Sequence, residues 1–215
     1  MRVDAIEEKF GDQVKIEWKS FMLRTEPKTS NREKFVAYTN SWQRCAETEP
    51  EAAFTTPWAS DASGPTSSLP AQVAWKAAAT FGAEAKDAMK RALMHAYFVD
   101  NRDISDGNEL IDIAVGVGID RAEFEAILDE RAGELAREVI TEHNDAISHG
   151  ITAVPTVVLD GLFPIPGAQD VATYERMVER MISRRQSGPI MAQMIAPSPM
   201  STPNPINSFR ILFPD

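Results

Sequence analysis

The stretch from Gly150 onward constrains the fold of this chain more than any other part of the sequence. "GITAVPTVVLDG" places a proline directly before an apolar, β-branched run, and its final Asp-Gly pair is typical of a tight turn between antiparallel strands. A second short apolar run, "LFPI", follows the turn. The next segment has the period of an amphipathic helix, whose apolar face comprises Val171, Tyr174, Met177, Val178 and Met181. The pattern predicts a β-hairpin closed by a helix, at about residues 150–186.

Pro155 stands where a central strand would need a backbone N–H. A proline is tolerated as the first residue of a strand, because its missing N–H need not interrupt the ladder there. The Val154–Pro155 bond can be cis at a cost of only ~0.5–1 kcal/mol. A loop proline ahead of a buried strand, a hairpin and a final helix form the second half of the thioredoxin fold, in which this proline is cis. A trans proline that simply begins a strand is the alternative.

The first part of the chain contains a helix, a strand and a second helix. Apolar residues have helical spacing up to Phe10, and "QVKIEWK", residues 13–19, alternates apolar and polar side chains like a half-buried strand. Ser30 or Asn31 is expected to cap the next helix. The packed face of that helix is expected to carry Phe35, Tyr38, Trp42 and Cys45.

A helical region and a tail account for most of the remaining chain. Residues 49–70 have the composition of a long surface connection, and helical periods follow from about residue 68 to residue 149. Within them, Ser105 and Asp106 are typical helix-capping residues. Beyond residue 186 the sequence has no sustained period and contains five prolines between positions 189 and 205. The segment 187–215 is therefore predicted to be a disordered or loosely docked tail.

Charge, targeting signals and metal-ligand spacing argue against several classes of function. The 215 residues carry a formal net charge of −10 without a cluster of Lys and Arg, so no nucleic-acid partner is expected. There is no signal-peptide core and no run of the ~18 apolar residues that a membrane helix needs, so we expect a cytoplasmic protein without membrane contact. His143 and His149 lack the i, i+4 spacing of paired ligands on a helix, so no metal is expected.

Two stretches resemble a known family. "HAYFVDNRDISDGNELIDIAVGVGID" and "GITAVPTVVLDGLFPIPGAQDVATYERMVERMI" resemble the DsbA-like thioredoxin-fold family. The similarity is greatest to its cytoplasmic bacterial branch of FrnE-type dithiol oxidoreductases and the related 2-hydroxychromene-2-carboxylate isomerases. The resemblance implies an α/β thioredoxin domain over residues 1–186, with a helical insertion at about 68–149 and a terminal ββα unit at about 150–186. It also implies a cis bond before Pro155.

The resemblance further implies a set of substrate-binding residues. The polar main-chain groups of Ala153 and Val154, ahead of Pro155, are expected to pair with an extended substrate segment, as in strand addition. Gln72 and Trp75 lie where the family places residues near its redox site, although core packing is an alternative for Trp75. His95 is expected to contact substrate. The expected partner is a thiol- or disulfide-containing peptide or small molecule, and a homodimer is possible.

The catalytic half of the family's site is missing from the sequence. Family members begin with a strand followed by Cys-x-x-Cys at the amino end of the first helix, where the helix dipole lowers the pKa of the attacking thiol. The chain contains one cysteine, Cys45, which we expect to be an inert core residue. No catalytic residue is therefore assigned. The fold should lack its first strand, leaving a gap between strands 13–19 and 155–159 with unpaired groups that cost ~1–3 kcal/mol each.

Three explanations remain open. The chain could be a truncated dithiol oxidoreductase, whose strand and dithiol lie upstream. It could be a redox-inactive binding or chaperone-like module, in which its own tail or a partner fills the gap; "SFRILFPD", residues 208–215, contains an apolar run that could supply the strand. It could also be an isomerase or transferase that uses glutathione, which is the one cofactor considered.

Overall fold

The computed structural model describes residues 2–29, 31–62, 64–186 and 206–213, the last group by its backbone. Two compact units make up the chain, and each is described by itself. The sheet unit comprises Met1–Phe21 and Asn144–Pro214, and the helical unit comprises Met22–His143. The helical unit therefore begins well before residue 68, because the long connection ahead of the predicted insertion also belongs to it.

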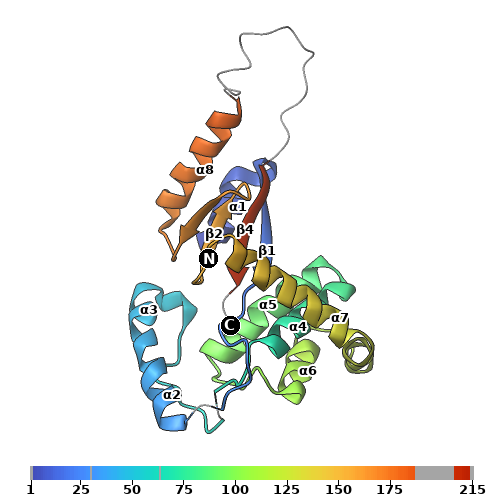
Figure 1. Ribbon diagram of the computed structural model, residues 1–215. Coiled ribbons are helices and arrows are strands. Elements are labelled where there is room, and N and C mark those ends of the chain that lie inside the picture. Colours follow the sequence, from blue (N-terminus) through green and yellow to red (C-terminus); the bar gives the residue numbers. More distant parts are fainter. Residues whose placement is uncertain (1, 30, 63, 187–205, 214–215) are drawn as a thin grey trace. The chain divides into compact units, whose positions relative to one another are not determined.

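A mixed four-stranded sheet organises the sheet unit. Its strands are β1 (Val14–Ser20), β2 (Thr156–Leu159), β3 (Phe163–Pro166) and β4 (Ile206–Phe213), in the spatial order β1-β4-β2-β3. β4 is parallel to β1 and antiparallel to β2, and Figure 1 shows it in red between them. The first, third and fourth strands along the sheet are those of the predicted β-strand and hairpin.

The central strand, β4, comes from the carboxyl-terminal segment. It has six register pairs with β1, including Trp18 with Ile211, and four with β2, including Val157 with the same Ile211. The predicted gap is therefore filled, in the position and direction that the fold's first strand would have. The prediction of a disordered or loosely docked tail does not hold for residues 206–213, because this β-favouring run gains main-chain partners on both sides. The rest of that segment lies outside the described residues.

Helices cover both faces of the sheet. α1 (Arg2–Phe10) and α8 (Val171–Gln186) pack together on one face. Their core cluster with the strands comprises Ile6, Phe10, Val14, Val157, Leu159, Ile165, Tyr174 and Val178. Alternation along β2 points Val158 the other way, where it packs with Phe21, Ala146 and Ile151. Ala146 belongs to the last turns of α7 (Arg121–Ser148), so the carboxyl end of α7 covers this second face.

The β2–β3 hairpin has the predicted turn and a blunted outer edge. Asp160 and Gly161 both have positive φ values, 56° and 70°, as a tight two-residue hairpin turn requires. The Gly167 N–H donates to the Pro155 carbonyl at 2.9 Å, so alternate residues of β3 direct their N–H groups toward β2. Residues 164 and 166 would direct theirs outward, but both are proline. This edge therefore offers few donors for pairing with another strand.

The helical unit matches the predicted succession of short helices. Along the chain these are α2 (Arg32–Thr39), α3 (Gln43–Thr48), α4 (Leu69–Ala78), α5 (Ala83–Phe98), α6 (Gly107–Gly116) and most of α7. Asn31 caps α2 by accepting the Lys34 N–H at 3.1 Å, and Asp106 caps α6 through the Asn108 and Glu109 N–H groups, as predicted. Ser30, the other candidate cap, lies outside the described residues.

Two residues of the predicted packed face are instead exposed. Phe35 and Trp42 are buried, but the side chain of Tyr38 is 55% exposed and Cys45 is exposed. The predicted continuous helix is interrupted by a 3₁₀ turn at Asn40–Trp42, which separates α2 from α3. Because a 3₁₀ turn has about three residues per turn, it changes the phase of the apolar face, and Cys45 leaves the packed side. The prediction of an inert core cysteine is therefore wrong.

Candidate substrate-binding site

The loop between α7 and β2 contains the predicted main-chain binding residues. α7 ends with Gly150 in a left-handed conformation (φ 76°), and the Ile151 N–H returns to the Ala146 carbonyl at 3.0 Å. This end of the helix fixes the start of the loop. The Val154–Pro155 peptide bond that follows is cis.

Hydrogen bonds hold the loop on both sides of Val154. The Thr156 hydroxyl donates to the Ala153 carbonyl at 2.6 Å, and the Pro155 carbonyl accepts the Gly167 N–H. The Val154 side chain packs against the core cluster of Phe21, Ala146, Ile151 and Val158. Within the described part of the chain, the N–H and C=O of Val154 have no hydrogen-bond partner. The loop is therefore anchored while this one residue keeps its main-chain polar groups available.

The geometry differs from the sequence prediction at Ala153. Its side of the loop is exposed, as expected, but its carbonyl is occupied by Thr156. Sequence analysis did not single out Thr156. The available signal was a threonine three residues after a loop carbonyl, since Ser and Thr side chains bond to nearby backbone groups.

Several chain segments meet at the same end of the sheet as this loop. The end of β4 lies there, because Leu212 pairs with Thr156 and Phe213 pairs with Ser20. The amino end of α1 is close as well, since Arg2 Nη1 donates to the Gln169 carbonyl at 2.8 Å, two residues after Gly167. The end of a central strand, the start of the first helix and the proline loop are thus assembled at one edge.

α8 begins beside this edge with a well-bonded carboxylate cap. Asp170 Oδ1 accepts the Thr173 N–H at 2.8 Å, and Oδ2 accepts the Thr173 hydroxyl at 2.9 Å. These two bonds, the backbone one first, lower the pKa of the Asp170 carboxyl below its ordinary value. The cap therefore stays ionised near neutral pH.

The other predicted site residues belong to the helical unit. On α4, Gln72 and Trp75 are buried, with 2% and 1% exposure. The Trp75 ring has the Nζ atoms of Lys76 and Lys86 at 5.1 and 4.7 Å from its centroid. On α5, His95 is exposed, with its Nδ1 3.1 Å from Asp100 Oδ2. The burial of Gln72 and Trp75 fits the core-packing alternative better than direct substrate contact.

The histidines set aside as metal ligands have structural contacts. His143 Nδ1 accepts the Met22 N–H at 3.2 Å, and His149 Nδ1 lies 2.6 Å from the Asp145 carbonyl. Over the described residues, no group of three or more His, Cys, Asp or Glu side chains is arranged to hold a metal ion. None of the helices described here is long and apolar enough to cross a bilayer.

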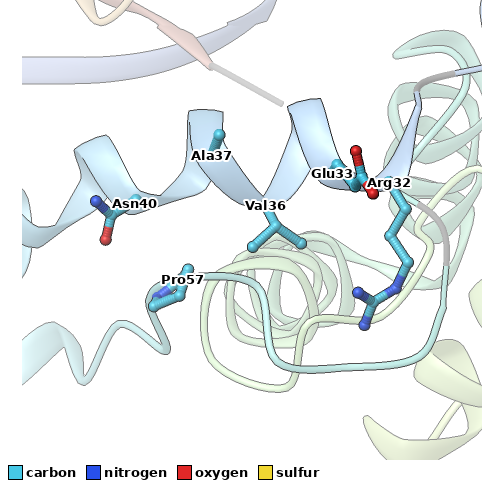
Figure 2. Close-up of a pocket in the computed structure, with 6 residues that line it drawn as sticks. All are labelled: Arg32, Glu33, Val36, Ala37, Asn40 and Pro57. Carbon is cyan, nitrogen blue, oxygen red and sulfur yellow. The ribbon is translucent and has the colours of Figure 1, made fainter.

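A shallow pocket of about 410 Å³ lies on α2 in the helical unit. In Figure 2, Val36 and Ala37 project from α2 with Pro57 opposite, and the polar side chains of Arg32, Glu33 and Asn40 complete the lining. Arg32 donates to the Ser60 carbonyl at 2.8 Å, so the loop after Pro57 holds its guanidinium. The open shape and single apolar side chains give it little capacity to enclose a ligand.

Comparison with known proteins assigns the chain to a family. The profile of the DSBA-like thioredoxin domain matches residues 1–179. The chain belongs to this family. Among solved structures, this DsbA-like chain is similar to a protein from Nitrosomonas europaea that is provisionally described as a protein disulfide isomerase. The two share 15% identity with a TM-score of 0.70, over 85% of this chain and 88% of the other.

A second similar structure is the cytosolic disulfide reductase DsbM from Pseudomonas aeruginosa. It shares 17% identity with a TM-score of 0.54, over 74% of this chain and 81% of DsbM. The same reductase solved with GSH gives 18% identity and a TM-score of 0.56, over 75% and 79% of the two chains. At these identities the likeness is one of fold. No curated protein matches the chain.

Proposed function

We propose that this DsbA-like protein binds an extended segment of a thiol- or disulfide-containing peptide or small molecule at Val154. The observation that carries the proposal is the pair of available main-chain groups on Val154, in a loop anchored by its side chain and by the hydrogen bonds of Ala153 and Pro155. One residue that presents both N–H and C=O can pair with one ligand residue, as a strand is added to a sheet.

Two such hydrogen bonds support only weak binding by themselves. A net contribution of ~0.5–1.5 kcal/mol per bond falls far below the ~8 kcal/mol of a micromolar complex. Apolar contacts to the rest of the ligand must supply the remainder. A small ligand should therefore bind weakly, and a longer segment more tightly.

We propose binding rather than disulfide exchange by these 215 residues alone. Exchange between a dithiol and a disulfide needs an attacking thiolate and a second thiol that resolves the mixed disulfide. The sequence contains one cysteine, and Cys45 lies on α3 of the helical unit. The presence of β4 in the central position supports a self-completed binding module over an explanation that requires another strand. The FrnE-type branch, a cytoplasmic location and a homodimer stay predictions.

Glutathione is the first probe for this site. It is a thiol tripeptide with a non-proline cysteine amide, and one structural neighbour was solved with GSH. The glutathione-dependent isomerase or transferase interpretation is tested by the same titration. S-methylglutathione is preferred because its thioether cannot exchange with Cys45.

Two measurements test the proposal. In an insulin-reduction assay, the protein with dithiothreitol should be no faster than dithiothreitol alone. In an NMR titration with S-methylglutathione, amide signals of Ala153, Val154 and Gly167 should shift together. Insulin reduction that survives Cys45→Ser would contradict the redox part. Shifts confined to the helical unit, for example around His95, or no shift at millimolar ligand, would contradict the binding part.

A further inference from the structure

Thr156 holds a main-chain group of the binding loop through its side chain. We infer that Thr156 is a positioning residue: its hydroxyl takes the Ala153 carbonyl out of ligand recognition, so that the site reads a single ligand residue through Val154. This inference rests on the proposed function and deepens it. It assigns no reacting group to Thr156.

The hydroxyl is fixed by the sheet and not by the loop. The main chain of Thr156 pairs with Pro166 of β3 on one side and with Leu212 of β4 on the other. Its side chain is 2% exposed, and a buried hydroxyl requires a hydrogen-bond partner. That partner is the Ala153 carbonyl at 2.6 Å. A rigid donor on the sheet therefore determines where this loop carbonyl points.

Neighbouring contacts leave Val154 as the residue that is presented. The Pro155 carbonyl is bonded to Gly167, and proline has no N–H to offer. With the Ala153 carbonyl also occupied, one acceptor and one donor remain together on Val154. The matching ligand residue must supply a free N–H and a free C=O. The site should therefore reject ligands with proline or an N-methylated residue at this position, whatever their side chains.

The test uses a matched pair of variants and a matched pair of ligands. Thr156→Val removes the hydroxyl and keeps the shape, whereas Thr156→Ser keeps the hydroxyl and removes the methyl group. The ligands are S-methylglutathione and its analogue methylated on the cysteine amide nitrogen. Wild type and Thr156→Ser should prefer the parent ligand by about tenfold, the value of one hydrogen bond of ordinary strength. Thr156→Val should lose most of that preference, because the loop no longer presents Val154 alone.

The outcomes separate the inference from the function on which it rests. If wild type binds S-methylglutathione and Thr156→Val discriminates between the two ligands as wild type does, the positioning role is overturned. If wild type does not bind, the proposed function fails. An independent readout uses the ligand-free wild type, in which the Thr156 hydroxyl proton should exchange slowly enough to be seen by NMR. A hydroxyl proton that exchanges too fast to observe would overturn the inference even if Thr156→Val failed to fold.

Discussion

Lys76 is the most deeply buried charged side chain described in the helical unit. It is 4% exposed, and its Nζ lies 2.7 Å from Glu138 Oε1 and 2.8 Å from Glu142 Oε1, so that α4 is tied to α7. The two carboxylates differ in environment: the Glu142 side chain is 12% exposed and that of Glu138 is 52% exposed. A buried ammonium depends mainly on its buried partner, because solvent screens the exposed one.

Glu142→Gln should destabilise the helical unit by about 2 kcal/mol, the range for a lost hydrogen bond to a charged group. Glu138→Gln is the matched control and should cost less than ~1 kcal/mol, as exposed ion pairs do. Urea denaturation followed by circular dichroism measures both through the shift of the midpoint. Equal effects of the two substitutions would show that burial of the carboxylate does not matter here.

Single residues show both the reach and the limit of prediction from sequence. The caps Asn31 and Asp106 were predictable, because a capping side chain bonds within three residues of its own position. The exposure of Cys45 was not, because one short 3₁₀ turn shifts every later residue around the helix axis. Thr156 was missed for another reason: its role depends on the loop conformation, which the sequence pattern does not specify.

At the level of elements, β4 completes the sheet. The hairpin, α8 and β1 follow from local periodicity, since each pattern is contained in a few consecutive residues. The apolar run near residue 208 was visible as a possible strand, but its partners are almost two hundred residues and about fifty residues away along the chain. Long-range pairing of this kind depends on which central position is vacant, and the local pattern carries no information about that.

Deletion of residues 206–215 should abolish cooperative folding of the sheet unit. Removal of a central strand leaves main-chain groups of β1 and β2 without partners, at ~1–3 kcal/mol for each that stays buried, against a total stability of ~5–15 kcal/mol. Deletion of residues 191–200 is the control, because it shortens the connection and keeps β4. Thermal unfolding measured by circular dichroism should separate the two variants. A 206–215 deletion that melts like the full chain would mean that β4 contributes nothing to stability.

At the scale of the whole molecule, the chain combines an intact binding edge with the absence of a dithiol. The sheet unit assembles the proline loop, the amino end of α1 and the end of β4 at one edge, and the DSBA-like profile covers residues 1–179. Family membership, the thioredoxin-type sheet and the single cysteine were all accessible from the sequence. The identity of the central strand was not, and it changes the interpretation from an incomplete fold to one that the chain completes itself.

Hydrogen–deuterium exchange of the β4 amides tests this account most directly. In the full-length protein, the amides of residues 209–212 should exchange as slowly as those of Val157 and Val158, because a central strand is hydrogen-bonded on both sides. NMR can follow these amides individually under native conditions. Exchange of residues 209–212 at the rate of an unstructured chain, while Val157 stays protected, would contradict the claim that β4 completes the sheet.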